Sequence, residues 1–366
     1  MAALIFILVL SFLVIIHELG HFFTARWAKM KVEEFGVGYP PRALKLFKWK
    51  ETLFSLNWIP FGGFVKIKGE DNVTGEFYQR PSYQQLIVIL AGATVNFVFG
   101  ILAFALVFTI SGVPTPIDQP RISTVAPNSP ASAAGIPTNV AITGIETAEE
   151  TIKIYTTDEA IAEIGQYRGE EITLITSGEC QPDSVDQCDP TEQKYEVYIR
   201  TAEETPANEG ALGVSFESAI YLEYPWYEKP FRAIWFGLVQ AIWLGKLIVV
   251  SLGQMVGDIL FKGSVPDTVA GPIRIVAQAS DSGIVAEGAL SVLAFAGMLS
   301  VNLAIINIMP IPALDGGRAL FITMKKIFGK QKLEKVEEYA NYFGYIFILA
   351  LIVIISIKDI ISVFFG

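Results

Sequence analysis

The chain has 366 residues, of which 52% are hydrophobic, and a formal net charge of −10. So large a hydrophobic share in a chain of this length excludes an ordinary soluble globular protein, and the acidic balance gives no support to nucleic-acid binding. The charge is unevenly placed, because residues 112–215 hold 18 acidic and 5 basic residues and the rest of the chain is therefore net positive.

The first element is an almost wholly apolar segment, residues 2–27. At about 1.5 Å per helical residue it can cross about 30 Å of hydrocarbon. It lacks the basic start and the small-residue cleavage site of a signal peptide. We therefore expect a retained membrane span.

This segment contains the only two histidines of the chain, His17 and His21, with Glu18 between them. Residues four apart share one face of a helix, so both imidazoles can reach one metal ion while Glu18 lies nearby. Two histidines can also satisfy each other in a core. However, ionisable groups in a spanning segment are costly and usually functional, so the pattern favours a hydrolytic zinc site.

Two elements follow before the acidic region. Residues 53–68 alternate partly in polarity and contain Gly62 and Gly63, which fits a hairpin or a plain loop equally well. Residues 86–110 form the second expected span, with Gly92, Asn96 and Gly100 at four-residue spacing. Small residues in that register favour close helix packing. Asn96 could bond across helices or serve the active site, and packing is the preferred interpretation.

Residues 112–220 form the acidic region, which contains Cys180 and Cys188. Disulfides persist in extracytoplasmic compartments, so we expect a bridge, with two free thiols as the alternative. Residues 177–194 are expected to form an inserted acidic loop.

A further apolar segment, residues 231–261, is interrupted by Gln240, Lys246, Gln254 and Asp258. This pattern suits an amphipathic helix at the membrane interface better than a span. Clearer spans are expected at residues 289–309 and 342–365.

The positive-inside rule tests this topology. The basic segments 26–82 and 318–335 should face the cytoplasm and the acidic block should face outward. That arrangement is consistent only if residues 231–261 do not cross. The sequence therefore predicts four spans.

Catalytic zinc usually takes three protein ligands, and there is no third histidine. Asp315 follows the apolar helix 289–309, at the membrane end where the two histidines are expected. Pro310 and Pro312 should break the helix before Asp315, and Gly316 and Gly317 permit a tight bend after it. A simple helix exit with a loop turn is the alternative. We predict Asp315 as the third ligand.

With the His-Glu-x-x-His motif near the start and residues 307–317 near the end, the chain resembles bacterial site-2 proteases. Residues 35–40, 58–66 and 271–273 match other segments of that family. These are zinc intramembrane metalloproteases of the type that cleaves anti-sigma factors. The resemblance implies an α-helical polytopic membrane protein with about four transmembrane helices, a membrane-dipping β-hairpin and one inserted extracytoplasmic PDZ-like α+β domain.

In such a protein the hairpin at 53–68, with Gly62 and Gly63, pairs with an extended substrate by β-strand addition. Asn307 is expected to bond the substrate backbone, while Asn302 stays open between that role and helix packing. Residues 122–136 match the strand, Pro turn and Ala-rich helix of a PDZ-like domain but lack the usual Gly-Asp turn afterwards. A steric filter is thus at least as well supported as peptide binding.

The expected organisation has four parts. They are a first membrane part (1–111), the extracytoplasmic domain (112–220), an interfacial segment (221–283) and a second membrane part (284–366).

The implied function is zinc-dependent cleavage of peptide bonds in or near transmembrane segments. Zn²⁺ on His17, His21 and Asp315 would activate water, with Glu18 as the general base. Substrates would be transmembrane proteins, such as an anti-sigma factor or signal-peptide remnants, in the bilayer of a bacterial cytoplasmic (inner) membrane. Two alternatives are a catalytically silent zinc-binding scaffold or chaperone, which would not need Glu18, and a membrane-anchored protease that cuts exposed loops.

Overall fold

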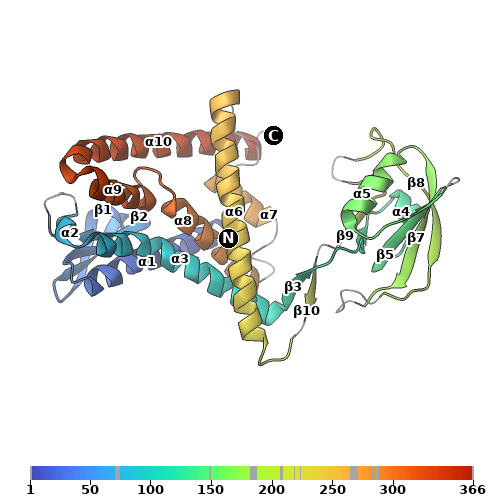
Figure 1. The fold of residues 1–366 in the computed structure, drawn as a ribbon, viewed down its shortest axis with the longest axis horizontal. Coiled ribbons are helices and arrows are strands. Elements are labelled where there is room, and N and C mark those ends of the chain that lie inside the picture. The colour runs from blue at the N-terminus through green and yellow to red at the C-terminus, as the bar shows by residue number, and fades with distance from the viewer. Residues whose placement is uncertain are drawn as a thin grey trace. The chain divides into compact units, whose positions relative to one another are not determined.

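The structure is a computed structural model and falls into two compact units (Figure 1). One comprises Met1–Val107 and Ala233–Gly366, and the other comprises Phe108–Arg232. The structure describes the whole chain except residues 1, 71–74, 148–149, 182–187, 207–208, 218, 223, 264–270, 282–283, 285–287 and 365–366.

Five helices among the described residues are long and apolar enough to cross a membrane, as expected for a polytopic α-helical membrane protein. Four of them coincide with the predicted spans, with ends extended by up to about a dozen residues. The five are α1 (Ala2–Trp27), α3 (Ser82–Ser111), α6 (Lys229–Lys262), α8 (Ala289–Ile308) and α10 (Lys330–Phe364).

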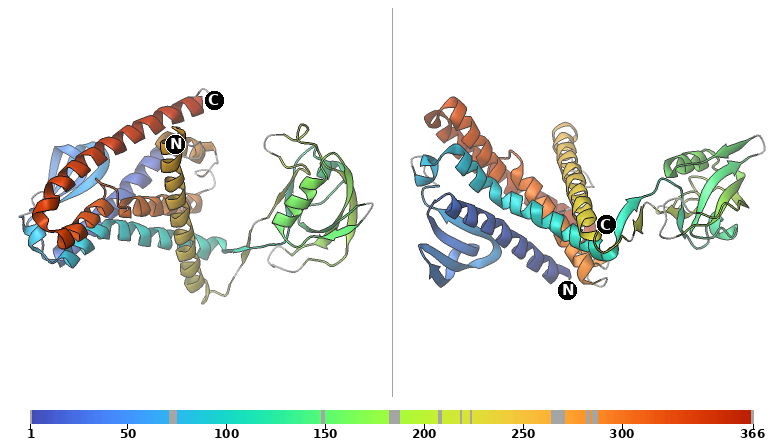
Figure 2. Two further views of the ribbon diagram at one scale, coloured as in Figure 1. Left: turned by 45° about the horizontal axis from the view of Figure 1, so that its top comes forward. Right: turned by 60° about the horizontal axis from the view of Figure 1, so that its bottom comes forward.

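Helix α6 differs from the expectation. The sequence predicted an interfacial helix that does not count as a span, whereas α6 qualifies by length and composition as a fifth candidate. The reason is that its polar residues are spread thinly enough to leave a long apolar stretch. In Figures 1 and 2, α6 runs across the direction of α1 and α3, and Gly237 brings it close to α3, where an added Cβ would lie 2.7 Å from the Ile101 carbonyl oxygen.

Helices α1, α3 and α8 pack closely because small residues line their contacts. A Cβ on Gly20 of α1 would lie 2.8 Å from the Ala91 carbonyl oxygen of α3. Between α3 and α8, Ser300 Oγ donates a 2.7 Å hydrogen bond to the carbonyl oxygen of Asn96. The predicted small-residue packing of α3 is therefore present, with Gly100 against Val301.

A two-stranded antiparallel hairpin, β1 (Val32–Trp49) and β2 (Thr52–Ile67), follows α1. The sequence predicted the whole hairpin within residues 53–68, but that segment is essentially the second strand. The first strand was not predicted, and its two glycines and two prolines are residues that strands disfavour. The aromatic ring of Phe22 on α1 packs edge-on against those of Phe35 and Phe54, which fastens the hairpin to α1.

The chain bends between α8 and α9 (Asp315–Phe328). Helix α8 ends at Ile308, before the two prolines, as predicted. The expected bend after Asp315 is wrong, because Gly316 and Gly317 belong to the first turn of α9. An added Cβ on either would lie 2.2 Å from a carbonyl oxygen of residues 308–311, so glycine is needed for close approach to the bend.

Two short helices complete the helical unit, α2 (Glu76–Gln79) and α7 (Pro272–Asp281). The buried carboxylate of Asp359 on α10 accepts hydrogen bonds from the backbone N–H groups of Gly271 and Arg274, at the start of α7.

The second unit is built from β-strands around its own hydrophobic core. Strand β3 pairs with β10 and β4 with β9, and a four-stranded sheet has the order β6-β5-β7-β8. The elements are β3 (Val113–Pro116), β4 (Ile122–Val125), α4 (Pro130–Ala133), β5 (Val140–Glu146), β6 (Thr151–Lys153), α5 (Thr157–Gln166), β7 (Glu171–Glu179), β8 (Gln193–Tyr198), β9 (Val214–Phe216) and β10 (Ala219–Leu222).

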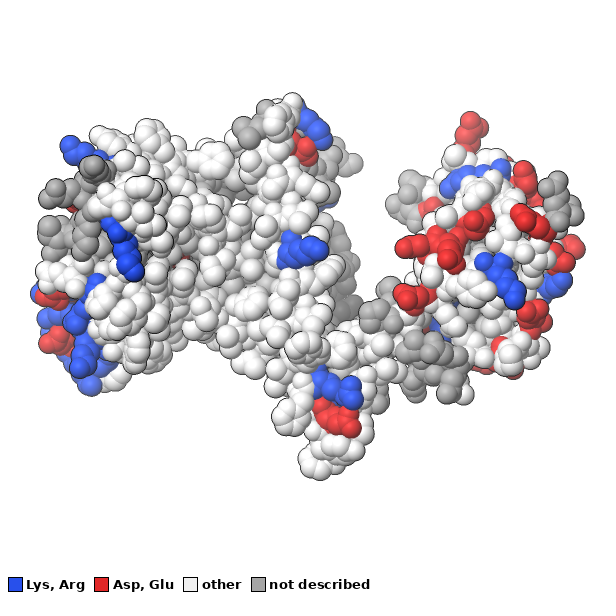
Figure 3. Space-filling model, in the orientation of Figure 1, with Lys and Arg blue, Asp and Glu red and all other residues white. Residues whose placement is uncertain are grey.

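The strand and the Ala-rich helix expected in residues 122–136 are present as β4 and α4, while the PDZ-like assignment stays a prediction. Cys180 and Cys188 form a disulfide, which resolves the choice left open by the sequence. Of the acidic loop predicted at residues 177–194, residues 182–187 lie outside the described residues, while its two ends belong to β7 and β8. Figure 3 shows acidic side chains spread over this unit, whereas most of the visible surface of the helical unit is uncharged.

Candidate metal centre

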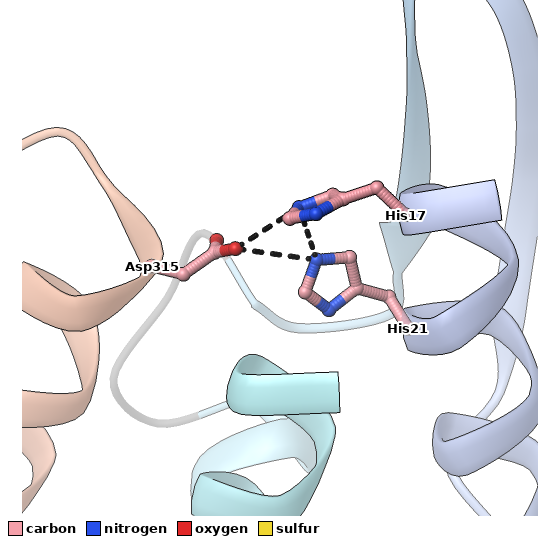
Figure 4. A group of neighbouring side chains, drawn as sticks. All are labelled: His17, His21 and Asp315. Carbon is pink, nitrogen blue, oxygen red and sulfur yellow. Dashed lines mark hydrogen bonds and ion pairs between the residues drawn. The ribbon is translucent and has the colours of Figure 1, made fainter. Parts of the chain in front are cut away.

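Three potential metal ligands converge where α1 meets the start of α9 (Figure 4). The Nε2 atoms of His17 and His21 lie 3.1 Å apart, and Asp315 Oδ2 lies 3.1 Å from the first and 3.4 Å from the second. The structure thus brings together the three residues that the sequence predicted as ligands.

These separations fit a shared zinc ion. Tetrahedral ligands held about 2.0 Å from zinc lie about 3.3 Å from one another, within a few tenths of an ångström of the distances found here. Asp315 Oδ2 is buried, and the two Nε2 atoms are the polar groups that the described residues place beside it. Two imidazole nitrogens and one carboxylate oxygen are also a donor set of catalytic zinc sites.

The orientation of His21 is determined by α3. Its Nδ1 lies 2.8 Å from the Val88 carbonyl oxygen. A carbonyl can only accept, so Nδ1 carries the hydrogen and the lone pair is left on Nε2, the atom that faces Asp315.

Asn96 of α3 lies beside the Nδ1 atom of His17, as Val88 lies beside that of His21. The Asn96 Nδ2 lies 3.5 Å from His17 Nδ1, and the Asn96 Oδ1 is buried without a hydrogen-bond partner among the described residues. Amide oxygen and nitrogen exchange places by a half-turn, which would let Oδ1 accept the Nδ1 hydrogen of His17. Asn96 was interpreted mainly as a packing residue, whereas its side chain faces the site.

Gly92 is a site residue that sequence reasoning assigned only to packing. An added Cβ would lie 2.5 Å from His21 Nε2 and 2.6 Å from His17 Nε2. Glycine is therefore required for both imidazoles to fit against α3. The four-residue spacing from Gly92 to Asn96 was the available signal, because it places both on one helix face.

Contacts on both sides of α9 hold Asp315 in place. The guanidinium of Arg318 forms a 2.7 Å ion pair with Glu70, after the hairpin. Burial lowers the pKa of Arg318, but the negative groups of Glu70, Tyr78 and Asp315 together more than offset this, so its pKa is raised. From the other side, Asn341 Oδ1 of α10 accepts a 3.0 Å hydrogen bond from the Ala313 backbone in the bend.

Glu18 faces the hairpin. A Cβ on Gly63 would lie 3.2 Å from Glu18 Cγ, so β2 passes directly over this carboxylate. Gly62 has a positive φ of 82° and lies against the ring of Tyr39 instead. Of the two predicted substrate-binding glycines, only Gly63 is therefore beside Glu18.

Asn302 and Asn307 both lie on α8 and are half-buried. Their side chains have no hydrogen-bond partner among the described residues, so their assignment to substrate stays a prediction.

Comparison with known proteins identifies relatives along nearly the whole chain. The model of Peptidase family M50 matches residues 5–351. A Clostridium perfringens protein named "Putative zinc metalloprotease" is 29% identical, with 97% of each chain covered. The zinc metalloprotease RasP of Geobacillus kaustophilus is 25% identical, with 97% of this chain and 96% of the relative covered.

Proposed function

The chain belongs to peptidase family M50, the site-2 protease family of zinc metalloproteases, and we propose that it hydrolyses peptide bonds in or near the transmembrane segments of single-span membrane proteins. The observation that carries the proposal is that Asp315 lies beside His17 and His21, which belong to an apolar helix long enough to span a membrane. Neither relative's name states which substrate it cleaves.

His17, His21 and Asp315 would hold the zinc ion, which supplies a Lewis acid that polarises the scissile carbonyl and makes water acidic enough to ionise near neutral pH. Glu18 accepts a proton from the attacking water and returns it to the departing amine. Val88 and Asn96 keep the two imidazoles oriented, and Gly92 leaves them room.

Cleavage within a membrane segment requires an unwound substrate, because the peptide bonds of a helix are hidden by its own side chains. The position of β2 over Glu18 supports this step. An extended substrate could pair with the hairpin edge by β-strand addition, which uses backbone hydrogen bonds and demands little sequence. The absence of a side chain at Gly63 leaves room for a backbone next to the base.

The charge distribution supports an orientation in a bacterial cytoplasmic membrane. Basic residues near the end of α1 and in α9 would face the cytoplasm, and the acidic unit would lie outside as a PDZ-like filter or peptide-binding module. This orientation requires that α6, although long and apolar enough to span, does not cross the bilayer from one side to the other. The substrates would be membrane proteins such as an anti-sigma factor or signal-peptide remnants, in contact with the bilayer.

The decisive experiment maps the cut site. The full-length protein in lipid nanodiscs, loaded with zinc, is mixed with single-span model peptides that also carry exposed loops, and the fragments are measured by mass spectrometry. Cuts inside or next to the apolar stretch are expected. Cuts confined to exposed loops would support a membrane-anchored protease instead, and no cuts in any peptide would favour the silent scaffold.

A further inference from the structure

A second polar site lies at the end of α1, where the helix meets the base of the hairpin. A cavity of about 450 Å³ opens there, and both α1 and the two strands contribute to its walls. Its lining residues are Arg26, Lys29, Met30, Lys31, Val32, Lys50, Glu51 and Thr52.

This cavity, the basic pocket, carries unbalanced positive charge. Glu51 is its one acidic lining residue, and it pairs with Lys31 at 3.3 Å. Arg26, Lys29 and Lys50 have no acidic partner among the residues that the structure describes. An anion is therefore the matching occupant.

Arg26 lines the pocket and is positioned to bind such an anion. Its guanidinium carbon lies 4.2 Å from the centre of the Trp49 ring, which limits its motion. Its Nη1 atom is buried and lacks a hydrogen-bond partner within the described part of the chain. A buried guanidinium donor without a partner is costly, so an acceptor in the pocket would relieve it.

The backbone supports this arrangement. Lys29 and Lys50 have positive φ angles of 57° and 53°, which residues other than glycine rarely adopt. These two residues lie in separate turns, one after α1 and one between the strands, and both turns line the same pocket. Strained backbone of this kind persists where surrounding structure over-determines it, often at ligand sites.

Aromatic residues indicate the depth of the pocket in a bilayer. Trp27, the last residue of α1, is 63% exposed, and Trp49 at the end of β1 is 45% exposed. Tryptophans of this kind gather where hydrocarbon meets headgroups. In Figure 3, Lys and Arg side chains gather at the end of the helical unit where Figure 1 labels the hairpin and α2.

We propose that the basic pocket binds the phosphate of an anionic phospholipid headgroup. Guanidinium and ammonium groups are the side chains that recognise phosphate, and basic pockets at the cytoplasmic membrane surface are typical headgroup sites. The bound lipid would join the end of α1 to the base of the hairpin, because both line the pocket. This site needs neither zinc nor proteolysis.

The test uses the full-length protein in detergent micelles that contain equal amounts of phosphatidylglycerol and phosphatidylcholine. Native mass spectrometry then counts the retained lipids. Preferential retention of phosphatidylglycerol is expected. Each basic residue strengthens such binding about fivefold, so Lys29→Gln with Lys50→Gln should weaken it about 25-fold.

Lys45→Gln with Lys48→Gln is the matched control, because it removes the same charge from exposed positions on β1 outside the pocket. Its lipid retention should not change. Equal losses in both double variants, or equal retention of the two lipids, would overturn the proposal. If the double pocket variant unfolds at a lower temperature than the wild type, Lys29→Gln alone is used for the test, and its affinity for phosphatidylglycerol should fall about fivefold.

A titration of the purified protein separates the lipid from free phosphate. Short-chain phosphatidylglycerol should bind more tightly than inorganic phosphate, since the exposed rings of Trp27 and Trp49 would contact its glycerol and acyl groups. Equal binding of inorganic phosphate would assign the pocket to a soluble anion and overturn the lipid assignment.

Discussion

Asp315 Oδ2 lies 3.1 Å from His17 Nε2, although the two residues belong to α9 and α1, near opposite ends of the chain. The proposed zinc site therefore exists only when the first and second membrane parts are packed together. A protein whose α9 has moved away from α1 would retain two ligands, which is too few for a catalytic zinc site.

Replacing Asp315 should empty the site. Asp315→Ala removes one of three donors, so the purified protein is expected to lose stoichiometric zinc and all cleavage of a spanning peptide. Zinc content is measured by atomic emission. Asp359→Asn is the control, because this buried carboxylate caps α7 instead, and it should lower the unfolding temperature while zinc is retained. Stoichiometric zinc in Asp315→Ala would refute the ligand assignment.

Glu18→Gln should separate metal binding from chemistry. The amide has nearly the same shape as the carboxylate but cannot accept the proton of water, so kcat should fall by about 10²–10⁴. Zinc content should be unchanged, because Glu18 is not among the three converging donors. The measurement is the rate of peptide cleavage in nanodiscs. Cleavage at the original rate would show that another group acts as the base.

Gly92→Ala should disturb the two imidazoles directly. Its methyl group would lie within 2.6 Å of both Nε2 atoms, so zinc affinity and cleavage should both fall sharply. Gly100→Ala, two turns along the same helix, meets Val301 and should reduce stability with zinc affinity preserved. Competition with a fluorescent chelator measures the affinity. Identical zinc affinities in the two variants would mean that Gly92 serves packing alone.

Asn96→Leu tests whether this amide orients His17. Removing an outer hydrogen-bond partner of a metal ligand typically weakens metal affinity 10–100-fold, and we expect a loss in that range. Asn96→Asp keeps an acceptor for the Nδ1 hydrogen and should recover much of the affinity. Ser300→Ala provides the control, since it removes only a bond to the Asn96 backbone and should leave zinc binding intact. Wild-type affinity in Asn96→Leu would contradict the orienting role.

The spans, the histidine pair and the family could be predicted from short stretches of sequence. Apolar runs of more than twenty residues predicted four of the candidate spans, because the thickness of the bilayer sets the length of a helix that crosses it. Helical periodicity placed His17 and His21 on one face, and the motifs identified the family. Zinc and the protease class followed from these residues, in agreement with the relatives.

Tertiary packing decided the rest. The spacing of Gly92 and Asn96 could not reveal that their helix face meets the histidines, because sequence periodicity defines a face but not the partner that covers it. The first hairpin strand, with its glycines and prolines, was not predicted, and α6 qualified as a fifth candidate span despite its polar residues. The approach of Asp315 to His17 depends on contacts between helices far apart in the chain, which no local pattern encodes.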